Sequence, residues 1–142
     1  MRVLLDTNVL LDVLLDREEH ARAAAALFAH AEHRRYTGLV AAISVPTVHY
    51  VVEKARGAGV AVQGVDRLLR LFEVAPVGRP ELAVEATVVL GFSDYEDGVV
   101  HAAAVSARAD AIVTRNGDDF GAATVSVHTP AEMLAVLAAS GL

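Results

Sequence analysis

Short apolar runs alternate along the chain with longer segments in which apolar residues recur at helical spacing. The first run, residues 2–5, stops at the polar cluster Asp6-Thr7-Asn8 and predicts a buried strand. The same pattern predicts further strands at residues 37–43, 73–77, 111–114 and 125–127. Helices are predicted between them at residues 9–15, 17–33, 44–55, 65–72, 81–90 and 93–108, with a closing helix from Pro130.

Capping and breaking residues set several of these boundaries. The polar cluster after residue 5 supplies a cap for the first helix, because a short polar side chain accepts a hydrogen bond from the free backbone N–H groups. Ser93 and Glu96 have the spacing of a capping box for the long helix that follows them. Gly57 and Gly59 are expected to end the helix that begins at residue 44.

Strands that alternate with helices predict an α/β fold with a mostly parallel sheet covered on both faces, an α/β/α sandwich. The chain has 142 residues without an internal repeat or a linker, so we expect a single domain over residues 1–142. Ligands of such sheets bind beyond the carboxyl ends of the strands, where the strand order reverses. The chemistry is therefore expected at that edge.

Composition narrows the class of protein. The chain contains no cysteine, which excludes disulfides, thiolate metal sites and a cysteine nucleophile. No apolar run is long enough to span a membrane and no signal peptide is recognisable, so a cytoplasmic protein is expected. With 12 basic and 18 acidic residues the net charge is −6, which does not favour nucleic-acid binding unless local arginine or a metal ion reverses the field.

Three acidic clusters are predicted to meet at one edge of the sheet. Asp6 follows the first strand, and the segment 114–119, which contains Asp118 and Asp119, follows the fourth. Asp94 and Asp97 lie three residues apart at the start of the long helix, on one helical face. Carboxylates that converge raise each other's pKa unless a cation neutralises them, which favours Mg²⁺ or Mn²⁺ and phosphodiester hydrolysis.

Each acid alone has an ordinary structural explanation. Asp6 and Glu96 can cap helices, and Asp94 can stabilise the positive end of one. Asp118 and Asp119 can be solvated turn residues. Their shared placement at strand ends is what supports a site.

These residues resemble the PIN-domain ribonucleases, including toxin nucleases of the VapBC type, over nearly the whole chain. Residues 6–12 are similar to the opening motif of that family, and residues 113–120 to its closing motif. The resemblance implies a PIN-like fold with Asp6 as the first metal ligand. Asp97 matches the third acid of the family, and Asn8 would hold the site by hydrogen bonding.

Two of the four family acids are replaced. The second falls at Tyr50, and the fourth falls at Asn116, whose carbonyl oxygen can bind a metal but brings no charge. Glu53 either reaches inward in place of the second acid or is exposed beside its basic neighbours. Asp118 or Asp119 can stand in for the fourth.

The resemblance implies a metal-dependent mechanism. Asp6 and Asp97 would hold one Mg²⁺ or Mn²⁺, assisted by Asp94 and Asn116 directly or through water, and a metal-bound hydroxide would attack a phosphodiester of single-stranded RNA. Thr114 would position water or substrate through its hydroxyl.

Basic residues and histidines have open roles. Arg115 either contacts phosphate or pairs with Asp118 at the surface. His101 is expected to be a packing residue, and His30 and His33 to be solvated. Further candidates for a substrate groove are Arg34, Arg35, Lys54 and Arg56.

Two functions follow from this sequence. The first is an endoribonuclease, the toxin of a toxin–antitoxin pair, with RNA as substrate, a cognate antitoxin as partner and a homodimer as the assembly. The alternative is a degenerate PIN fold that binds RNA or a protein without cutting. Asp6 and Asp97 favour the first, whereas Tyr50 and Asn116 favour the second.

Overall fold

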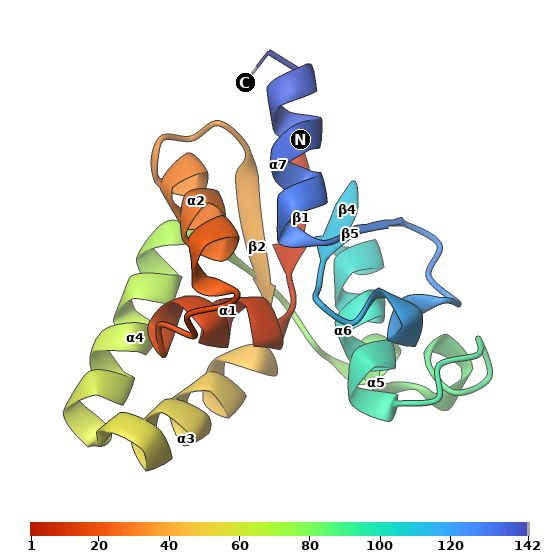
Figure 1. The fold of residues 1–142 in the computed structure, drawn as a ribbon. Helices are drawn as coiled ribbons and strands as arrows, with labels where there is room; N and C mark the ends of the chain where they lie inside the picture. Colours follow the sequence, from red (N-terminus) through yellow and green to blue (C-terminus); the bar gives the residue numbers. More distant parts are fainter. Residues whose placement is uncertain (142) are drawn as a thin grey trace.

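Strand β1, Arg2–Leu5, lies at the centre of a five-stranded sheet in the computed structural model, which describes residues 1–141. The strand order is β3-β2-β1-β4-β5 and every pairing is parallel, which confirms the predicted sheet (Figure 1). The order reverses between β1 and β4, so the carboxyl ends of these two strands are the expected place for a site. The other strands are β2 (Thr37–Ala41), β3 (Glu73–Ala75), β4 (Ala111–Val113) and β5 (Ser126–His128).

Helices cover both faces of the sheet because side chains along each strand point alternately to either side. Val3 and Leu5 of β1 belong to one core, and Leu4 belongs to the other. The first face carries α1 (Thr7–Leu14), α2 (Ala21–Glu32), α3 (Ser44–Arg56), α4 (Ala58–Leu71) and α7 (Pro130–Ala139). The second face carries α5 (Arg79–Leu82), the 3₁₀ turns η1 (Val84–Ala86) and η2 (Gly117–Phe120), and α6 (Tyr95–Ser106) (Figure 1).

Several predicted boundaries are wrong, among them the start of the helix predicted over residues 65–72, which begins at Ala58 as α4. Helix α2 begins at Ala21 rather than residue 17, because residues 17–20 form a separate turn in which the His20 N–H donates to the Arg17 carbonyl oxygen at 2.8 Å. Strand β2 ends at Ala41 rather than residue 43. Gly57, at φ 91°, separates α3 from α4, and Gly59 lies inside α4 instead of ending a helix.

The predicted helix at residues 81–90 is also wrong. Helix α5 ends at Leu82 because Ala83 is extended, with ψ 140°, and a short 3₁₀ turn and loop follow. The Thr87 hydroxyl donates to the carbonyl oxygens of Ala83 and Val84, which closes a local turn in place of a continuing helix. The cap of α6 is Asp94 rather than Ser93, since the Asp94 carboxylate accepts from the Asp97 N–H at 3.0 Å.

Within residues 1–141, no helix has the length and apolar character that crossing a membrane requires.

Candidate active site

Asp6 lies where β1 ends and α1 begins, and its side chain is only 6% exposed. One carboxylate oxygen, Oδ1, accepts from the Thr7 N–H at 2.8 Å, so Asp6 is the cap of α1. The other oxygen, Oδ2, accepts from the Thr114 hydroxyl at 2.8 Å. A capping role and a place in the acidic cluster are therefore compatible, because the two oxygens face different partners.

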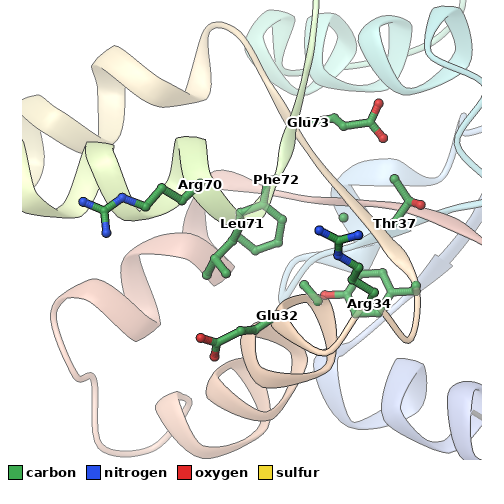
Figure 2. A pocket seen from close by; sticks show the side chains of 10 residues that line it. Glu32, Arg34, Thr37, Arg70, Leu71, Phe72 and Glu73 are labelled. Atoms are coloured by element: carbon green, nitrogen blue, oxygen red, sulfur yellow. The ribbon is translucent and has the colours of Figure 1, made fainter.

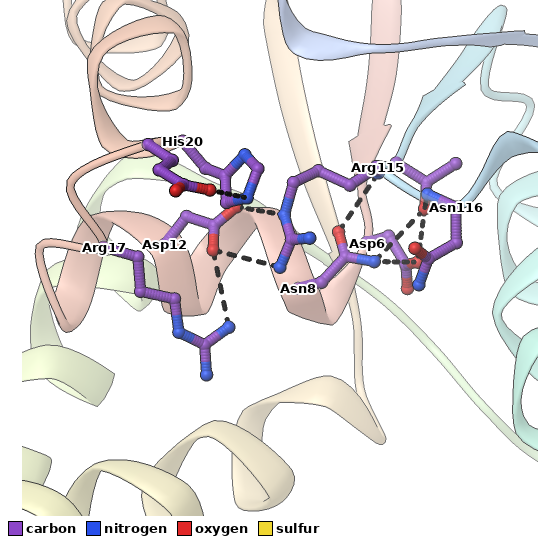
Figure 3. Close-up of polar contacts among 9 residues, drawn as sticks. Asp6, Asn8, Asp12, Arg17, His20, Arg115 and Asn116 are labelled. Atoms are coloured by element: carbon purple, nitrogen blue, oxygen red, sulfur yellow. Dashed lines mark hydrogen bonds and ion pairs between the residues drawn. The ribbon is translucent and has the colours of Figure 1, made fainter.

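Asn8 and Thr114 join the end of β1 to the end of β4 (Figure 3). The Asn8 amide donates to Thr114 Oγ1 at 3.3 Å and to Asp6 Oδ2 at 3.4 Å, and its Oδ1 accepts from the Arg115 N–H at 3.3 Å. Thr114 is fully buried and also accepts from the Asn116 N–H at 3.1 Å. These bonds place Asp6 and hold the segment after β4 beside it.

Asp97 stands in the first turn of α6, next to the capping Asp94. Asp94 uses Oδ1 for the cap, so one of its two oxygens remains for another partner. Glu96, expected to be the capping glutamate, instead adds negative charge that acts on both Asp6 and Asp97. The acids of β1 and α6 therefore form one electrostatic cluster.

The electrostatics of this cluster raise the pKa of two carboxyl groups. Burial raises the pKa of Asp6, and the hydrogen bonds from Thr114 and Thr7 oppose that effect. Burial and then the charge of Asp6 raise the pKa of Asp97 from 3.8 to about 7, with further contributions from Asp94, Asp119 and Glu96. Asp6 and Asp97 thus repel each other when both are ionised.

A buried carboxylate outside the predicted site pairs with two arginines. Asp12 of α1 is 0% exposed and accepts from Arg115 Nε at 2.6 Å and from Arg115 Nη2 at 3.3 Å. Arg17 Nη1 lies 3.4 Å from the same carboxylate (Figure 3). Arg115 therefore pairs with Asp12 and not with Asp118, because the buried acid requires a cation. Sequence reasoning missed Asp12, although a charged residue flanked by Leu11 and Val13 in an apolar helix was the available signal.

Tyr50 and Asn116, which stand where two family acids are expected, differ in how close they come to the acidic cluster. Tyr50 is 57% exposed, with Lys54 Nζ 4.9 Å from its ring centroid, and Glu53 is exposed as expected for a solvated residue. Asn116 is exposed at the start of η2, and its backbone N–H donates to the Thr114 hydroxyl that holds Asp6 (Figure 3). Asp119, and not Asp118, is one of the charges that act on Asp6 and Asp97.

The remaining predicted cations lie away from the cluster. Arg34 and Arg35 directly precede β2, at the amino edge of the sheet and opposite Asp6, so they are not part of its groove. Arg34 lines a cavity of about 530 Å³ there, together with Arg70 and Glu73 (Figure 2). Arg56 donates from Nη2 to the Leu15 carbonyl oxygen at 2.8 Å, which satisfies the end of α1.

The histidines follow the structural expectations. His101 is buried against Phe92, at 4.9 Å between ring centroids, and accepts from the Thr124 N–H at 3.0 Å. His30 and His33 are within hydrogen-bonding distance of the carbonyl oxygens one turn earlier in α2. These three histidines are packing or helix residues, as predicted.

The donor set suits a cation bound through few protein ligands. Within residues 1–141 no three histidine or carboxylate side chains lie close enough together to form a metal cluster. Asp6 and Asp97 nevertheless repel each other at one edge, and no arginine or lysine pairs with either of them among the described residues. Mg²⁺ is commonly held by one or two carboxylates, with waters and substrate phosphates completing its shell, so these residues fit it.

A family model described as a PIN domain matches residues 2–118 of the chain. No protein with a curated description matches it at the significance we required.

Several solved structures share the fold. VapBC2 from Rickettsia felis, bound to a DNA fragment from its promoter, has a TM-score of 0.68 at 17% identity, over 91% of this chain and 98% of that chain. FitAcB from Neisseria gonorrhoeae gives 0.66 at 24% identity, over 90% and 97%. A toxin–antitoxin complex from Klebsiella pneumoniae gives 0.65 at 21% identity, over 90% and 97%.

Proposed function

The chain belongs to the PIN domain family, and on that basis we propose that it is a metal-dependent endoribonuclease that cuts single-stranded RNA. The observation that carries the proposal is the mutual repulsion of Asp6 and Asp97 at the edge where β1 and β4 end. Two buried or half-buried carboxylates without a basic partner are unfavourable unless a cation joins them. A divalent cation supplies the positive charge that the two acids lack, and the same cation attracts the negative phosphodiester.

Asp6 and Asp97 would hold Mg²⁺ or Mn²⁺, with Asp94 and Asn116 assisting directly or through water. When bound, the cation lowers the pKa of a water molecule and stabilises charge on the phosphate. Thr114 holds the Asp6 carboxylate by its 2.8 Å hydrogen bond, which orients the acid toward the site. Asn8 fixes the backbone of Arg115, so the guanidinium can meet the RNA backbone near the cleaved bond.

A toxin role is part of the same proposal. The similar structures from Rickettsia felis and Klebsiella pneumoniae are toxin–antitoxin proteins, and this supports a cognate antitoxin as the partner of this chain. A homodimer and a cytoplasmic location belong to the proposal as well. Co-expression with the gene upstream or downstream, followed by size-exclusion chromatography with light scattering, measures both the partner and the dimer.

A second function is supported by the replaced acids. Tyr50 brings no charge and is 57% exposed, and Asn116 brings only a neutral oxygen. A PIN fold with a weakened metal site could bind RNA or a protein without cutting. The two functions differ in whether a phosphodiester bond is broken.

The deciding experiment is cleavage of a panel of mixed single-stranded RNAs by purified protein in Mg²⁺, Mn²⁺ or EDTA. An Asp6→Asn/Asp97→Asn double variant is the inactive control, and Asp118→Asn is the matched control, because Asp118 is exposed and absent from the charges that act on Asp6. Metal-dependent cutting that the double variant loses and Asp118→Asn keeps supports the nuclease. Folded, partner-free protein that cuts no better than the double variant supports the binding module.

A further inference from the structure

A cavity of about 350 Å³ is lined in part by Arg115, which follows Thr114, the residue that holds Asp6, and we call it the side cavity. Arg115 follows β4 and Thr129 follows β5, so the side cavity opens at the same edge of the sheet as Asp6. Its lining comes from the start of α2, the segment after β4 and the start of α7. The lining residues are Glu19, His20, Ala23, Arg115, Thr129, Pro130 and Ala131.

Arg115 connects the side cavity to Asn8 of the candidate site. Its backbone N–H donates to Asn8 Oδ1, and its Nε and Nη2 donate to the buried Asp12. Within residues 1–141, Nη1 donates to no protein acceptor, and the side chain is 27% exposed. The guanidinium is thus fixed in place while part of its donor edge remains available for a ligand.

The other walls offer mainly apolar surface. Ala23, Pro130 and Ala131 present methyl and ring carbons, and the His20 side chain is 40% exposed at the rim, next to Glu19. Figure 3 shows the His20 ring and the Arg115 guanidinium on neighbouring sides of Asp12. A planar group with apolar faces and polar edges matches this combination of small apolar walls, an imidazole ring and a guanidinium.

We propose that the side cavity binds an unpaired nucleobase of the substrate strand, next to the phosphate that meets Asp6 and Asp97. This inference rests on the proposed function and adds a reason for a single-stranded substrate. A base in a duplex is stacked and paired, so it cannot enter a cavity that lies beside the path of the RNA backbone. The volume holds one base with its sugar outside. Of the two N–H groups on Arg115 Nη1, one donates to the base edge and the other remains for the neighbouring phosphate.

The test uses mononucleotides, which contain no phosphodiester bond to cleave. Adenosine, uridine and guanosine 5′-monophosphates are titrated in EDTA into ¹⁵N-labelled full-length protein, with ribose 5-phosphate as the probe without a base. We expect amide shifts at Ala23 and Ala131 with at least one nucleotide and none with ribose 5-phosphate. The 2′-deoxy nucleotides form a separate arm that distinguishes RNA from DNA as the source of the base.

Two alanines on α2 provide the matched variants. Ala23→Leu fills the side cavity, and we expect it to weaken nucleotide binding about tenfold, in line with the loss of one stacked base. Ala29→Leu places the same side chain at an exposed position of α2 outside the side cavity, and we expect no change. His20→Ala is a second variant that removes a side chain instead of adding one. It still tests the side cavity if Ala23→Leu lowers the Tm so far that its binding cannot be measured.

Equal binding of ribose 5-phosphate and the nucleotides overturns the inference, and so does an unchanged affinity in Ala23→Leu and His20→Ala. These results are independent of the cleavage assay. Cutting that needs Asp6 without base binding refutes the nucleobase site alone. Base binding without cutting supports the site and refutes the nuclease.

Discussion

Asp12 carries a charge at a position with no access to water, between two arginines from different parts of the chain. Breaking such a pair is costly because the remaining groups lose a partner in a poorly solvated place. Arg115 and Arg17 are 27% and 37% exposed, so water partly compensates when Asp12 is removed. The effect should therefore fall below that of a fully buried pair.

We expect Asp12→Ala to lower the free energy of unfolding by about 2 kcal/mol, against roughly 3–5 kcal/mol for a fully buried pair. Urea denaturation followed by circular dichroism measures the difference. The matched control is Asp66→Ala, which removes the exposed pair with Arg70 and should cost less than about 1 kcal/mol. Equal effects of the two variants would show that Asp12 holds nothing in place.

The raised pKa values of the acids of the site predict how the stability of the fold changes with pH in the absence of metal. The pKa of Asp97 is raised from 3.8 to about 7, so between these values the folded chain binds more protons than the unfolded chain. Stability is therefore higher near pH 5 and falls as the pH rises through 7. The raised pKa of Asp6 acts in the same direction.

In EDTA we expect the Tm to fall between pH 5 and pH 8, and Asp97→Asn to reduce that fall and to melt higher than the parent at pH 8. Differential scanning calorimetry across this range measures both effects. Added Mg²⁺ should raise the Tm of the parent at pH 8 more than that of the variant, because a bound ligand stabilises the folded state. A parent Tm that rises with pH over this window would contradict the assignment.

Sequence reasoning found the residues whose neighbours in the chain carry the signal. Asp6, Asn8, Asp97 and Thr114 sit at the ends of elements with clear patterns, and the structure brings Asp6, Asn8 and Thr114 into contact. Asp12 was missed because its partner Arg115 is 103 residues away. The apolar neighbours of Asp12 in α1 indicate a buried charge, but no local pattern shows which residue pairs with it.

At the scale of elements, α6 approaches the loop around Thr87 too closely for a side chain at Gly98. A Cβ built at Gly98 would lie 2.8 Å from Thr87 Cβ and 3.1 Å from Thr87 Cα. Gly98 is next to Asp97 in the chain, so this close approach sets the distance of α6, and with it of Asp97, from the loop around Thr87. Glu81 adds a second contact, because its carboxylate accepts from the Ser106 hydroxyl at 2.8 Å.

We expect Gly98→Ala to destabilise the protein by about 1–3 kcal/mol through overpacking, although alanine usually favours a helix interior. Gly59→Ala in α4 is the control, because a Cβ there meets nothing within 4 Å and should stabilise by up to about 1 kcal/mol. Chemical denaturation of both variants gives the comparison. Stabilisation by both would mean that α6 and the Thr87 loop separate freely.

Predictions for elements succeeded where the chain contains clear start signals and failed where tertiary contacts decide. Helices α3 and α6 were placed to within two residues because start signals stand at or just before their first residues, Ser44 for α3 and residues 93–96 for α6. Residues 81–90 have apolar side chains on all sides, and many of them remain exposed, including Val84 and Val89. Their path is set by contacts with α6, and the helical pattern there was misleading.

For the whole molecule, the net charge of −6 limits how the proposed RNA substrate can bind. Arg115 and Arg17, which both pair with Asp12, are the cations that we expect to meet RNA, so about two phosphate contacts are available. Each contact with a single strand contributes about −0.7 to the slope of log K against log salt concentration.

We expect a slope of about −1.4, which is roughly a sevenfold loss of affinity between 50 and 200 mM salt. Fluorescence anisotropy with a labelled nonanucleotide at constant Mg²⁺ measures it, and Arg115→Gln should make the slope shallower by about 0.7. The control is Arg34→Gln, which changes a cation at the opposite edge of the sheet and should leave the slope unchanged. A slope steeper than about −4 would require a basic track elsewhere on the surface.

The strand order has a consequence for synthesis of the chain. Asp6 is made first, but Thr114, which holds it, is made 108 residues later, and β1 gains its neighbour β4 only then. Domains fold as their chains emerge, so a nascent chain that stops before residue 111 carries the first acid without the strand that completes the site. If the proposed nuclease is correct, an interrupted translation product of this kind would not cut RNA, and activity would begin only once the chain extends past Thr114.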